Sequence, residues 1–224
     1  MDNYKKALKF WDNFFINKEV GPVNEKFVDS DIFNKILTDN IYDDSKVLDY
    51  GCGSGWGLFE IYLTKKFKEG LGIDASANAI LYANKMLEAS NFNDKLKFIN
   101  GTEEVLKDYQ NYFNFILSVN TIDVVPDEVV SKILQALDFS LEKAGHLLIC
   151  LNPNFTEQEL IDVVHLEKKG NYYFKDEILR CNYKSITEWE NLFKERFNLI
   201  KSEPFKLTTG EKYYRRLYLL EKKK

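Results

Sequence analysis

Cysteine and histidine are scarce in this chain, and their scarcity limits the chemistry that it can perform. The sequence has three cysteines and two histidines in 224 residues. The cysteines are far apart and odd in number, and none has the Cys-x2-Cys spacing of a structural zinc site. His146 and His165 do not complete a ligand cluster. We therefore expect reduced structural thiols and no metal site.

Long apolar runs and clusters of one charge are also missing. No apolar segment approaches the roughly 20 residues that cross a bilayer, and the N-terminal segment MDNYKKALKFWDNFF lacks the apolar core of a signal peptide. The formal net charge is −4, and the lysines are scattered. A nucleic-acid binder would normally present a basic face. These absences predict a cytoplasmic protein that contacts neither membrane nor nucleic acid.

The chain is long enough for one sizeable core, and its apolar pattern alternates between strands and helices. Aromatic residues from Tyr4 to Phe15 recur at helical spacing, and Asp31–Leu37 predicts a second short helix. Pro126 is expected to open a helix that Gly145 closes. Ser76 is expected to cap another helix. Five strands are expected between these helices, namely Lys46–Tyr50, Gly70–Ile73, Leu96–Ile99, Phe113–Val119 and His146–Leu151.

This alternation predicts a parallel, doubly wound sheet. The C-terminal part differs from it. Ser185 and Glu188 form a capping-box pattern before a helix. Asn198–Ile200 and Leu217–Leu220 then follow as two strands with no helix between them, which predicts an antiparallel pair.

The most informative segment is a glycine-rich loop, VLDYGCGSGWG, at Val47–Gly57. Glycines there allow positive φ and bring a ligand close to bare backbone, and the N-terminus of the following helix attracts anions. Dinucleotide sites share these features, but G-x-G-x-x-G would require glycine in place of Trp56 or Leu58. Asp49 would repel a pyrophosphate and attract an ammonium. S-adenosylmethionine (SAM), with its ammonium, carboxylate and sulfonium, suits this combination.

A second carboxylate supports a nucleoside ligand. Asp74 ends the next strand, about 20 residues beyond the loop, where it can accept hydrogen bonds from both hydroxyls of a ribose. Because NAD and SAM share that ribose, Asp74 does not choose between them. Gly101, Thr102 and Glu103 follow the third strand, where polar groups can meet an adenine edge.

Four segments between Asp44 and Leu151 resemble successive motifs of class I SAM-dependent methyltransferases: VLDYGCGSGWG, GLGIDAS, FINGTEE and FNFILSVNTIDVVPD. The similarity is closest to the small-molecule branch, methyltransferase types 11 and 25. It implies SAM as cofactor, S-adenosylhomocysteine (SAH) as product, and a Rossmann-like α/β fold. That fold has a doubly wound, seven-stranded, mostly parallel sheet with one antiparallel edge strand, here with an N-terminal helical cap.

The resemblance also implies roles for individual residues. Asp49, Gly51, Gly53 and Gly55 would hold the methionine end, with Cys52 contributing its backbone. Asp74 would hold the ribose. Around the adenine and the reacting end, the implied contacts are Ala75, Thr102, Glu103 and Asn120. Within a single domain we expect a helical cap (1–42), a cofactor-binding core (44–151), a substrate-side insertion and helix (152–197) and a C-terminal strand pair (198–224).

Residues for the methyl acceptor are harder to assign. Tyr4 and Trp11 could close over the sulfonium, although core packing is the more frequent role of such a stripe. Tyr173 and Arg180 lie in the insertion after the fifth strand, which can reach the ligand-binding edge of an open α/β sheet. Asp123 could act as a base, but a turn before Pro126 is favoured. The catalytic residue stays unassigned.

The sequence therefore predicts in-line transfer of a methyl group from SAM to an oxygen, nitrogen or carbon of a small molecule. The alternatives are a methyltransferase acting on protein or RNA and a non-catalytic SAM-fold binding protein. An NAD(P)-dependent oxidoreductase is disfavoured by the glycine spacing, by Asp49 and by the absence of a Tyr-x-x-x-Lys pair. The acceptor, the methylated atom and the oligomeric state are left open.

Overall fold

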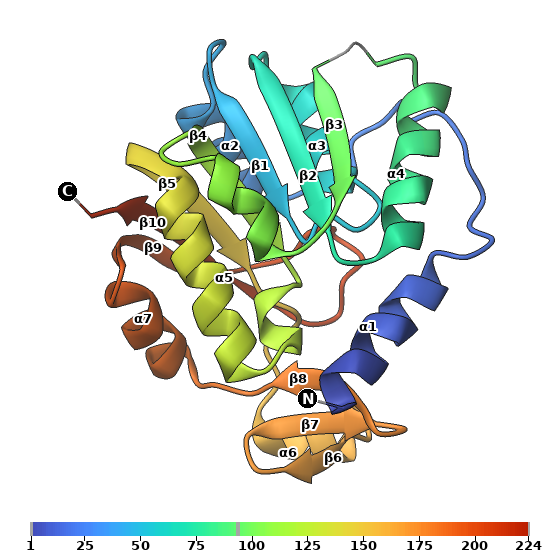
Figure 1. The fold of residues 1–224 in the computed structure, drawn as a ribbon. Helices are drawn as coiled ribbons and strands as arrows, with labels where there is room; N and C mark the ends of the chain where they lie inside the picture. Colours follow the sequence, from blue (N-terminus) through green and yellow to red (C-terminus); the bar gives the residue numbers. More distant parts are fainter. Residues whose placement is uncertain (1, 93–94, 224) are drawn as a thin grey trace.

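The computed structural model describes residues 2–92 and 95–223, which form a large sheet with helices on both faces and a second, smaller sheet (Figure 1). The strands of the large sheet are β1 (Lys46–Tyr50), β2 (Glu69–Asp74), β3 (Leu96–Asn100), β4 (Phe113–Val119), β5 (Leu141–Cys150), β9 (Phe197–Phe205) and β10 (Arg215–Lys222). Those of the smaller sheet are β6 (Glu167–Lys169), β7 (Tyr172–Lys175) and β8 (Ile178–Asn182).

Seven α-helices occur in the described part of the chain, together with two 3-10 helices: α1 (Asp2–Phe14), α2 (Asp31–Asn40), α3 (Trp56–Thr64), α4 (Ala77–Ala89), α5 (Asp127–Ser140), α6 (Glu157–Asp162), α7 (Ile186–Lys194), η1 (Glu103–Asp108) and η2 (Ile122–Val124). The expected N-terminal caps are confirmed. The Ser76 hydroxyl accepts a hydrogen bond from the Ala79 N–H, and Ser185 with Glu188 forms a capping box. Across residues 2–92 and 95–223, no helix is long and apolar enough to cross a membrane.

The large sheet has the strand order β3-β2-β1-β4-β5-β10-β9. Strands β1 to β5 pair in parallel, whereas β10 runs antiparallel to both of its neighbours, β5 and β9. The predicted seven-stranded, mostly parallel sheet is thus confirmed. Its reversed strand is β10, which lies one place in from the edge, and β9 forms the edge itself.

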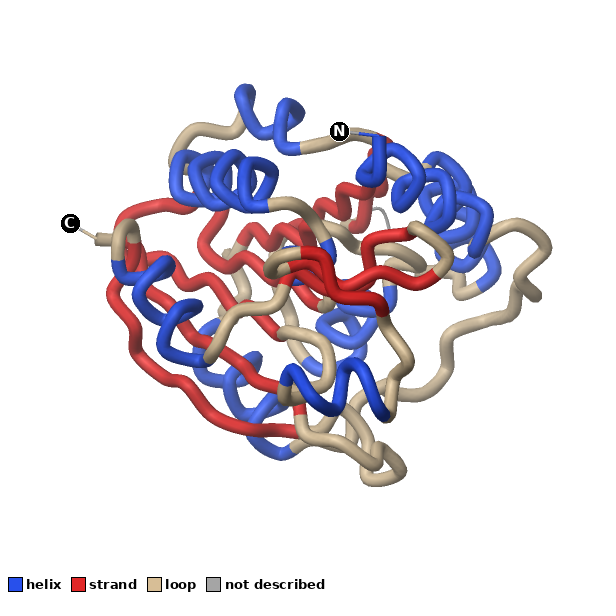
Figure 2. The backbone as a smooth tube through the Cα atoms, turned by 90° about the horizontal axis from the view of Figure 1, so that it is seen from below, coloured by secondary structure: helices blue, strands red, loops and turns tan. Residues whose placement is uncertain are grey.

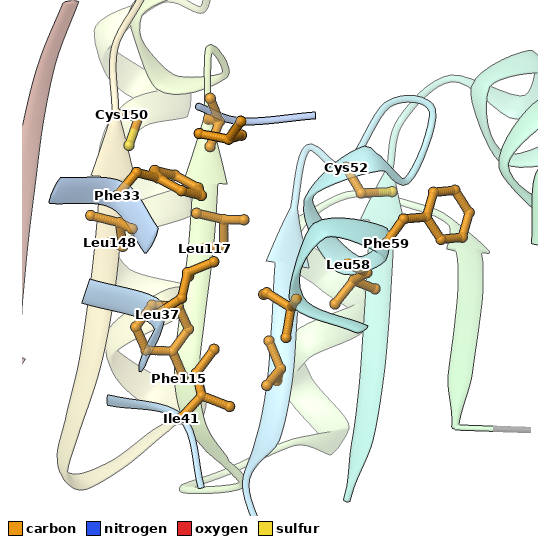
Figure 3. Packing of buried hydrophobic residues seen from close by; sticks show 14 of the residues in the cluster. Phe33, Leu37, Ile41, Cys52, Leu58, Phe59, Phe115, Leu117, Leu148 and Cys150 are labelled. Carbon is orange, nitrogen blue, oxygen red and sulfur yellow. The ribbon is translucent and has the colours of Figure 1, made fainter. Parts of the chain in front are cut away.

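The core consists of two apolar layers, one on each face of the large sheet. Successive residues of a strand point to opposite faces, so Val47 belongs to one layer and Leu48 to the other. Phe33 and Leu37 of α2 pack on the first face, close to Phe115 and Leu148 (Figure 3). Of the two helices expected in the N-terminal cap, α2 is therefore a core helix, and α1 alone lies toward the carboxyl ends of the strands.

Gly145 has a different role from the one predicted. It does not close α5, which ends at Ser140 and leads directly into β5. Ala144 has a φ of 57°, and the pairing of β4 with β5 is irregular in this region. A methyl group at Gly145 would lie 3.0 Å from the main-chain oxygens of both Asn114 and Glu142. Glycine is thus needed here for a close approach of backbones in a bulge.

The insertion forms a structure that the sequence pattern did not predict. Strands β6, β7 and β8 pair antiparallel into a separate sheet, with α6 before it in the chain. This sheet lies at the end of the molecule where α1 begins (Figure 1). Figure 2 views the protein from that end, with the small sheet in front of the large one. Strand β8 contacts α1, so the insertion and the N-terminal helix meet near the carboxyl ends of the parallel strands.

Candidate functional site

A cavity of about 430 Å³ lies at the carboxyl ends of the parallel strands. It is lined by the loop after β1, by the ends of β2, β3 and β4, and by α1 and β8. The loop and the three strand ends contribute, in this order, Gly51–Ser54, Asp74–Ser76, Gly101–Thr102 and Val119–Thr121. The size falls within the roughly 300–1,000 Å³ of small-molecule sites. Its place matches the general rule that open α/β sheets bind ligands outside the carboxyl ends of their strands.

The glycine loop has the backbone conformation that its sequence predicts. Gly51, Gly53 and Gly55 all have positive φ. A methyl group at Gly51 would lie 2.2 Å from Oγ1 of Thr121, and one at Gly55 would lie 2.6 Å from the Phe98 ring. Gly51 therefore lets the loop pass close to the end of β4, whereas Gly55 caps α3 and does not line the cavity. Cys52 lies at the cavity and is itself buried.

Asp74 lies at the end of β2 and lines the cavity. One carboxylate oxygen accepts a hydrogen bond from the Gly53 N–H at 2.8 Å, and the other accepts one from the Ser76 N–H at 2.8 Å. Burial raises the pKa of this carboxyl, and the two main-chain donors lower it in part. The glycine loop and the acidic residue at the end of β2 are thus parts of a single hydrogen-bonded unit.

Asp49 lies beneath the loop rather than at the cavity wall. It is only 3 % exposed, and a methyl group at Gly57 would lie 2.6 Å from its Oδ2. Burial, together with the nearby charge of Asp74, raises the pKa of Asp49 to about 8, and a hydrogen bond from the Leu58 main chain opposes that rise. Asp49 would therefore not touch a ligand directly. It would act on the ligand by supporting the glycine loop and by the charge of its ionised form.

The predicted adenine contacts divide into two groups. Ala75 and Thr102 line the cavity. Glu103 does not, and its carboxylate instead accepts a hydrogen bond from the Tyr50 hydroxyl at 3.4 Å. Tyr4 lines the cavity from α1, and burial raises the pKa of its phenol, with further contributions from the charges of Glu103 and Asp74.

Asn120, at the end of β4, also lines the cavity, and its φ of 56° is left-handed. Its side-chain oxygen accepts a hydrogen bond from Nη1 of Arg215 at 2.8 Å, and Arg215 in turn forms an ion pair with Glu211. The amide is therefore held by the first residue of β10, which Glu211 of the preceding loop fixes in place. Sequence reasoning missed Arg215 because nothing in a single sequence links it to Asn120, which lies 95 residues earlier.

Helix α1 forms the roof of the cavity through the aromatic and apolar side chains of Tyr4, Leu8, Trp11 and Phe14, and Phe15 extends this face directly after the helix. Asp12, on the same helix, anchors α1 to the N-terminus of α4 by hydrogen bonds. Its carboxylate accepts hydrogen bonds from the Ser76 hydroxyl at 2.8 Å and from the Asn78 N–H at 3.0 Å. These donors at the N-terminus of α4 lower the pKa of Asp12. The aromatic stripe of α1 was visible in the sequence, but the hydrogen bonds from Ser76 and Asn78 to Asp12 were not.

The residues expected on the acceptor side fall in three different places. Trp11 and Arg180 line the cavity. Tyr173 is fully buried and donates its hydroxyl to Glu157, so it lies outside the cavity wall. Asp123 is also displaced from the cavity, because both of its oxygens accept hydrogen bonds from Asn152. It borders a separate cavity of about 40 Å³, and burial raises the pKa of its carboxyl.

The residues at this cavity fit SAM. The carboxylate oxygens of Asp74 at the cavity wall are acceptors of the kind that ribose hydroxyls bind, and the ionisable carboxyl of Asp49 lies beneath the loop, where its charged form would attract an ammonium. The aromatic roof suits a sulfonium, because ring faces attract cations. No group of three or more His, Cys, Asp or Glu side chains that could hold a metal ion occurs within 2–92 and 95–223.

Comparisons with known proteins decide the family. The family profile described as "Methyltransferase domain" matches residues 17–217, most of the chain. The chain belongs to this methyltransferase family. Protein-lysine N-methyltransferase EFM4 of Saccharomyces cerevisiae is 26 % identical over 159 residues, which are 63 % of this methyltransferase and 69 % of that protein.

Solved structures confirm the fold of the methyltransferase. The PH0226 protein from Pyrococcus horikoshii OT3 is 19 % identical, with a TM-score of 0.69 over 85 % of this chain and 88 % of that one. A SAM-dependent methyltransferase from Methanosarcina mazei is also 19 % identical, with a TM-score of 0.66 over 84 % and 96 % of the two chains. With the family match, the cofactor is SAM and the chain is a SAM-dependent enzyme.

Proposed function

We propose that this methyltransferase transfers a methyl group to a small molecule that binds beneath α1, next to the cofactor. The roof over the cavity carries this proposal. Helix α1 covers the ligand-binding edge and is fastened on one side by Asp12 to α4, while β8 packs against its other side. A cavity that a helix partly covers favours a small acceptor over one presented on the surface of a macromolecule.

The proposed division of the chain follows the arrangement of these parts. Residues 44–151 hold the cofactor through the glycine loop, Asp74, Ala75 and Thr102, with Asn120 near the reacting end. Residues 152–197 supply the acceptor side through β8. Helix α1, within 1–42, closes the site, and the strand pair of 198–224 completes the sheet and holds Asn120 through Arg215.

When bound, SAM supplies a methyl group on a positively charged sulfur. The protein's own part is alignment and exclusion of water, since an in-line displacement depends mainly on positioning. The loop and Asp74 hold the donor against the sheet edge, and the aromatic face of α1 excludes water above it. Asp74 is the one carboxylate among the described residues that line the cavity, and the loop holds it through Gly53. We therefore assign no general base.

A protein acceptor is the second candidate, and one observation favours it. The yeast relative is named as a protein-lysine methyltransferase. A lysine acceptor would have to enter the cavity from the surface, past the aromatic side chains of α1.

Methyl transfer from radiolabelled SAM into a cell extract tests the proposal. The extract is first divided by ultrafiltration into a small-molecule filtrate and a protein fraction, and each is incubated with the enzyme. The proposal predicts enzyme-dependent label in the filtrate alone. Label in the protein fraction alone would support the lysine alternative, and SAH binding with no label in either fraction would support a non-catalytic protein. The Asp74→Ala variant provides the control for activity at this site.

A further inference from the structure

The charges on the cavity wall are unevenly distributed between its two sides. Among the described residues that line it, Arg180 is the one cation and Asp74 is the one carboxylate. Asp74 comes from the core and is already bound to the glycine loop. Arg180 comes from β8 in the insertion, on the acceptor side. A positive charge therefore faces the part of the cavity that the proposed acceptor would occupy.

The guanidinium of Arg180 is held by rings and not by an anion. Its central carbon lies 4.7 Å from the centre of the Phe10 ring and 5.3 Å from that of Trp11. Such stacking occupies the flat face of a guanidinium and leaves its N–H edges available. Within residues 2–92 and 95–223, the Arg180 side chain makes no hydrogen bond or ion pair. The carboxylate of Glu177, three residues earlier in the chain, is paired with Lys6.

A second donor without a partner lies beside it. The indole Nε1 of Trp11 is buried and has no hydrogen-bond partner in the described part of the chain, and Trp11 lines the cavity. Buried donors are almost always paired, and leaving one unpaired costs free energy. This N–H is covered by protein atoms, so the donor available to a ligand on this side of the cavity is the Arg180 guanidinium.

We propose that the methyl acceptor is a small carboxylic acid with an apolar body, whose carboxylate binds the Arg180 guanidinium. This inference rests on the proposed function. The aromatic face of α1 packs against the apolar body, while Arg180 sets the orientation of the other end. A single cation matches a carboxylate better than a phosphate dianion. The same charge disfavours a lysine ammonium in the cavity.

The alternative partner for Arg180 is the carboxylate of the cofactor itself. Phe15, directly after α1, is the residue next to the glycine loop, since a methyl group at Gly53 would lie 3.3 Å from its ring. Trp11 lies about one helical turn earlier in the chain, and Arg180 of β8 stacks against the Trp11 ring. This placement favours the acceptor, and the experiment below distinguishes the two partners.

Binding of matched acids and amides to the SAH-saturated full chain tests the inference without turnover. The probes are benzoate, 4-hydroxyphenylacetate, 4-hydroxycinnamate and octanoate, each titrated calorimetrically against its own primary amide. We expect at least one acid to bind about tenfold or more tightly than its amide, as charged hydrogen bonds allow. Arg180→Gln should abolish this preference, and Arg180→Lys should retain part of it. Arg196→Gln, a matched loss of charge outside the cavity wall, should leave it unchanged.

Three results would overturn the inference. The first is that no acid binds the wild-type protein more tightly than its amide. The second is that Arg180→Gln keeps the preference. The third is that Arg180→Gln weakens SAH binding by about tenfold or more, which would assign Arg180 to the cofactor. None of these results depends on where label appears in the extract assay, so failure here is distinct from failure of the proposed function.

Discussion

The carboxylate of Asp74 and the main-chain N–H of Gly53 are joined by a hydrogen bond of 2.8 Å, which links the end of β2 to the glycine loop. The second carboxylate oxygen is bound by the Ser76 N–H. A carboxylate has about four acceptor positions, so two ribose hydroxyls can still bind without breaking either contact. The loop is therefore already positioned around the residue that we assign to the ribose.

Replacing Asp74 tests that assignment. Asp74→Ala removes the ribose acceptors and also the partner of the Gly53 N–H. Because hydrogen bonds to charged groups contribute about 1.5–3 kcal/mol each, we expect SAH to bind about 10- to 100-fold more weakly. Isothermal titration calorimetry measures this change. Asp44→Ala, at an exposed carboxylate before β1, is the control and should bind as the wild type does. Wild-type affinity in Asp74→Ala would remove the ribose assignment.

Asp49 should make stability depend on pH. Its pKa is about 8 in the folded protein and about 3.9 in an unfolded chain. The folded state thus holds the proton more tightly, and this contribution to stability is lost as pH rises from about 4 to 8. Asn cannot ionise, so Asp49→Asn should gain stability relative to wild type over that range. By pH 8.5 the gain should reach at least about 1 kcal/mol, or roughly 2–4 °C in Tm.

Thermal unfolding of both proteins at pH 5 and pH 8.5 provides the measurement. A Tm difference that is the same at both pH values would contradict the raised pKa. The same variant should bind SAM more weakly at pH 8.5, because the charge beneath the loop is gone. Asn keeps the size and the acceptor oxygen that the Leu58 main chain uses, so a change in shape does not account for the loss.

Asp12 should control how firmly α1 covers the cavity. Asp12→Ala removes the acceptor for the Ser76 hydroxyl and the Asn78 N–H, and with it the negative charge at the N-terminus of α4. We expect faster hydrogen exchange in α1 and weaker SAH binding, by about 5- to 30-fold for a loss of roughly 1–2 kcal/mol. Asn13→Ala, at the exposed next position, should change neither quantity. If hydrogen exchange in α1 is unchanged in Asp12→Ala, contacts other than those of Asp12 hold α1 over the cavity.

Gly51 should tolerate no side chain. In Gly51→Ala the new methyl group would overlap Thr121 in a backbone with a φ of +73°, and overpacking of this kind costs about 1–3 kcal/mol. We expect a lower free energy of unfolding in urea and weaker SAH binding. Gly21→Ala is the matched control, since no atom lies within 4 Å of its added methyl group. Equal stability of the two variants would contradict the close approach of the loop and β4.

The sequence predicted the large sheet and the glycine loop because both depend on local patterns. The apolar runs of β1 to β5 and the left-handed conformations of Gly51, Gly53 and Gly55 are set by neighbouring residues in the chain. Gly145 was misassigned because a glycine after a helical pattern suits a cap as well as a bulge. The choice between them depends on Asn114, which lies on another strand.

The acceptor side was predicted less well because its geometry depends on contacts between distant segments. Tyr172 to Phe174 lie on one strand, and an irregularity in its pairing with β8 accompanies the burial of both Tyr173 and Phe174, with the Tyr173 hydroxyl bound to Glu157. Arg180 and Trp11 are far apart in the chain, and only the packing of β8 against α1 brings them together. A single sequence carries no signal for such pairs.

The central claim is that the cavity between the glycine loop and α1 binds SAM, and a crystal structure of the protein grown with SAH tests it most directly. The account predicts that the ribose of SAH contacts Asp74, that its adenine lies against Ala75 and Thr102, and that its amino-acid end lies along Gly51–Gly53 beneath the α1 rings. SAH bound elsewhere on the protein, or an empty cavity at saturating SAH, would contradict it.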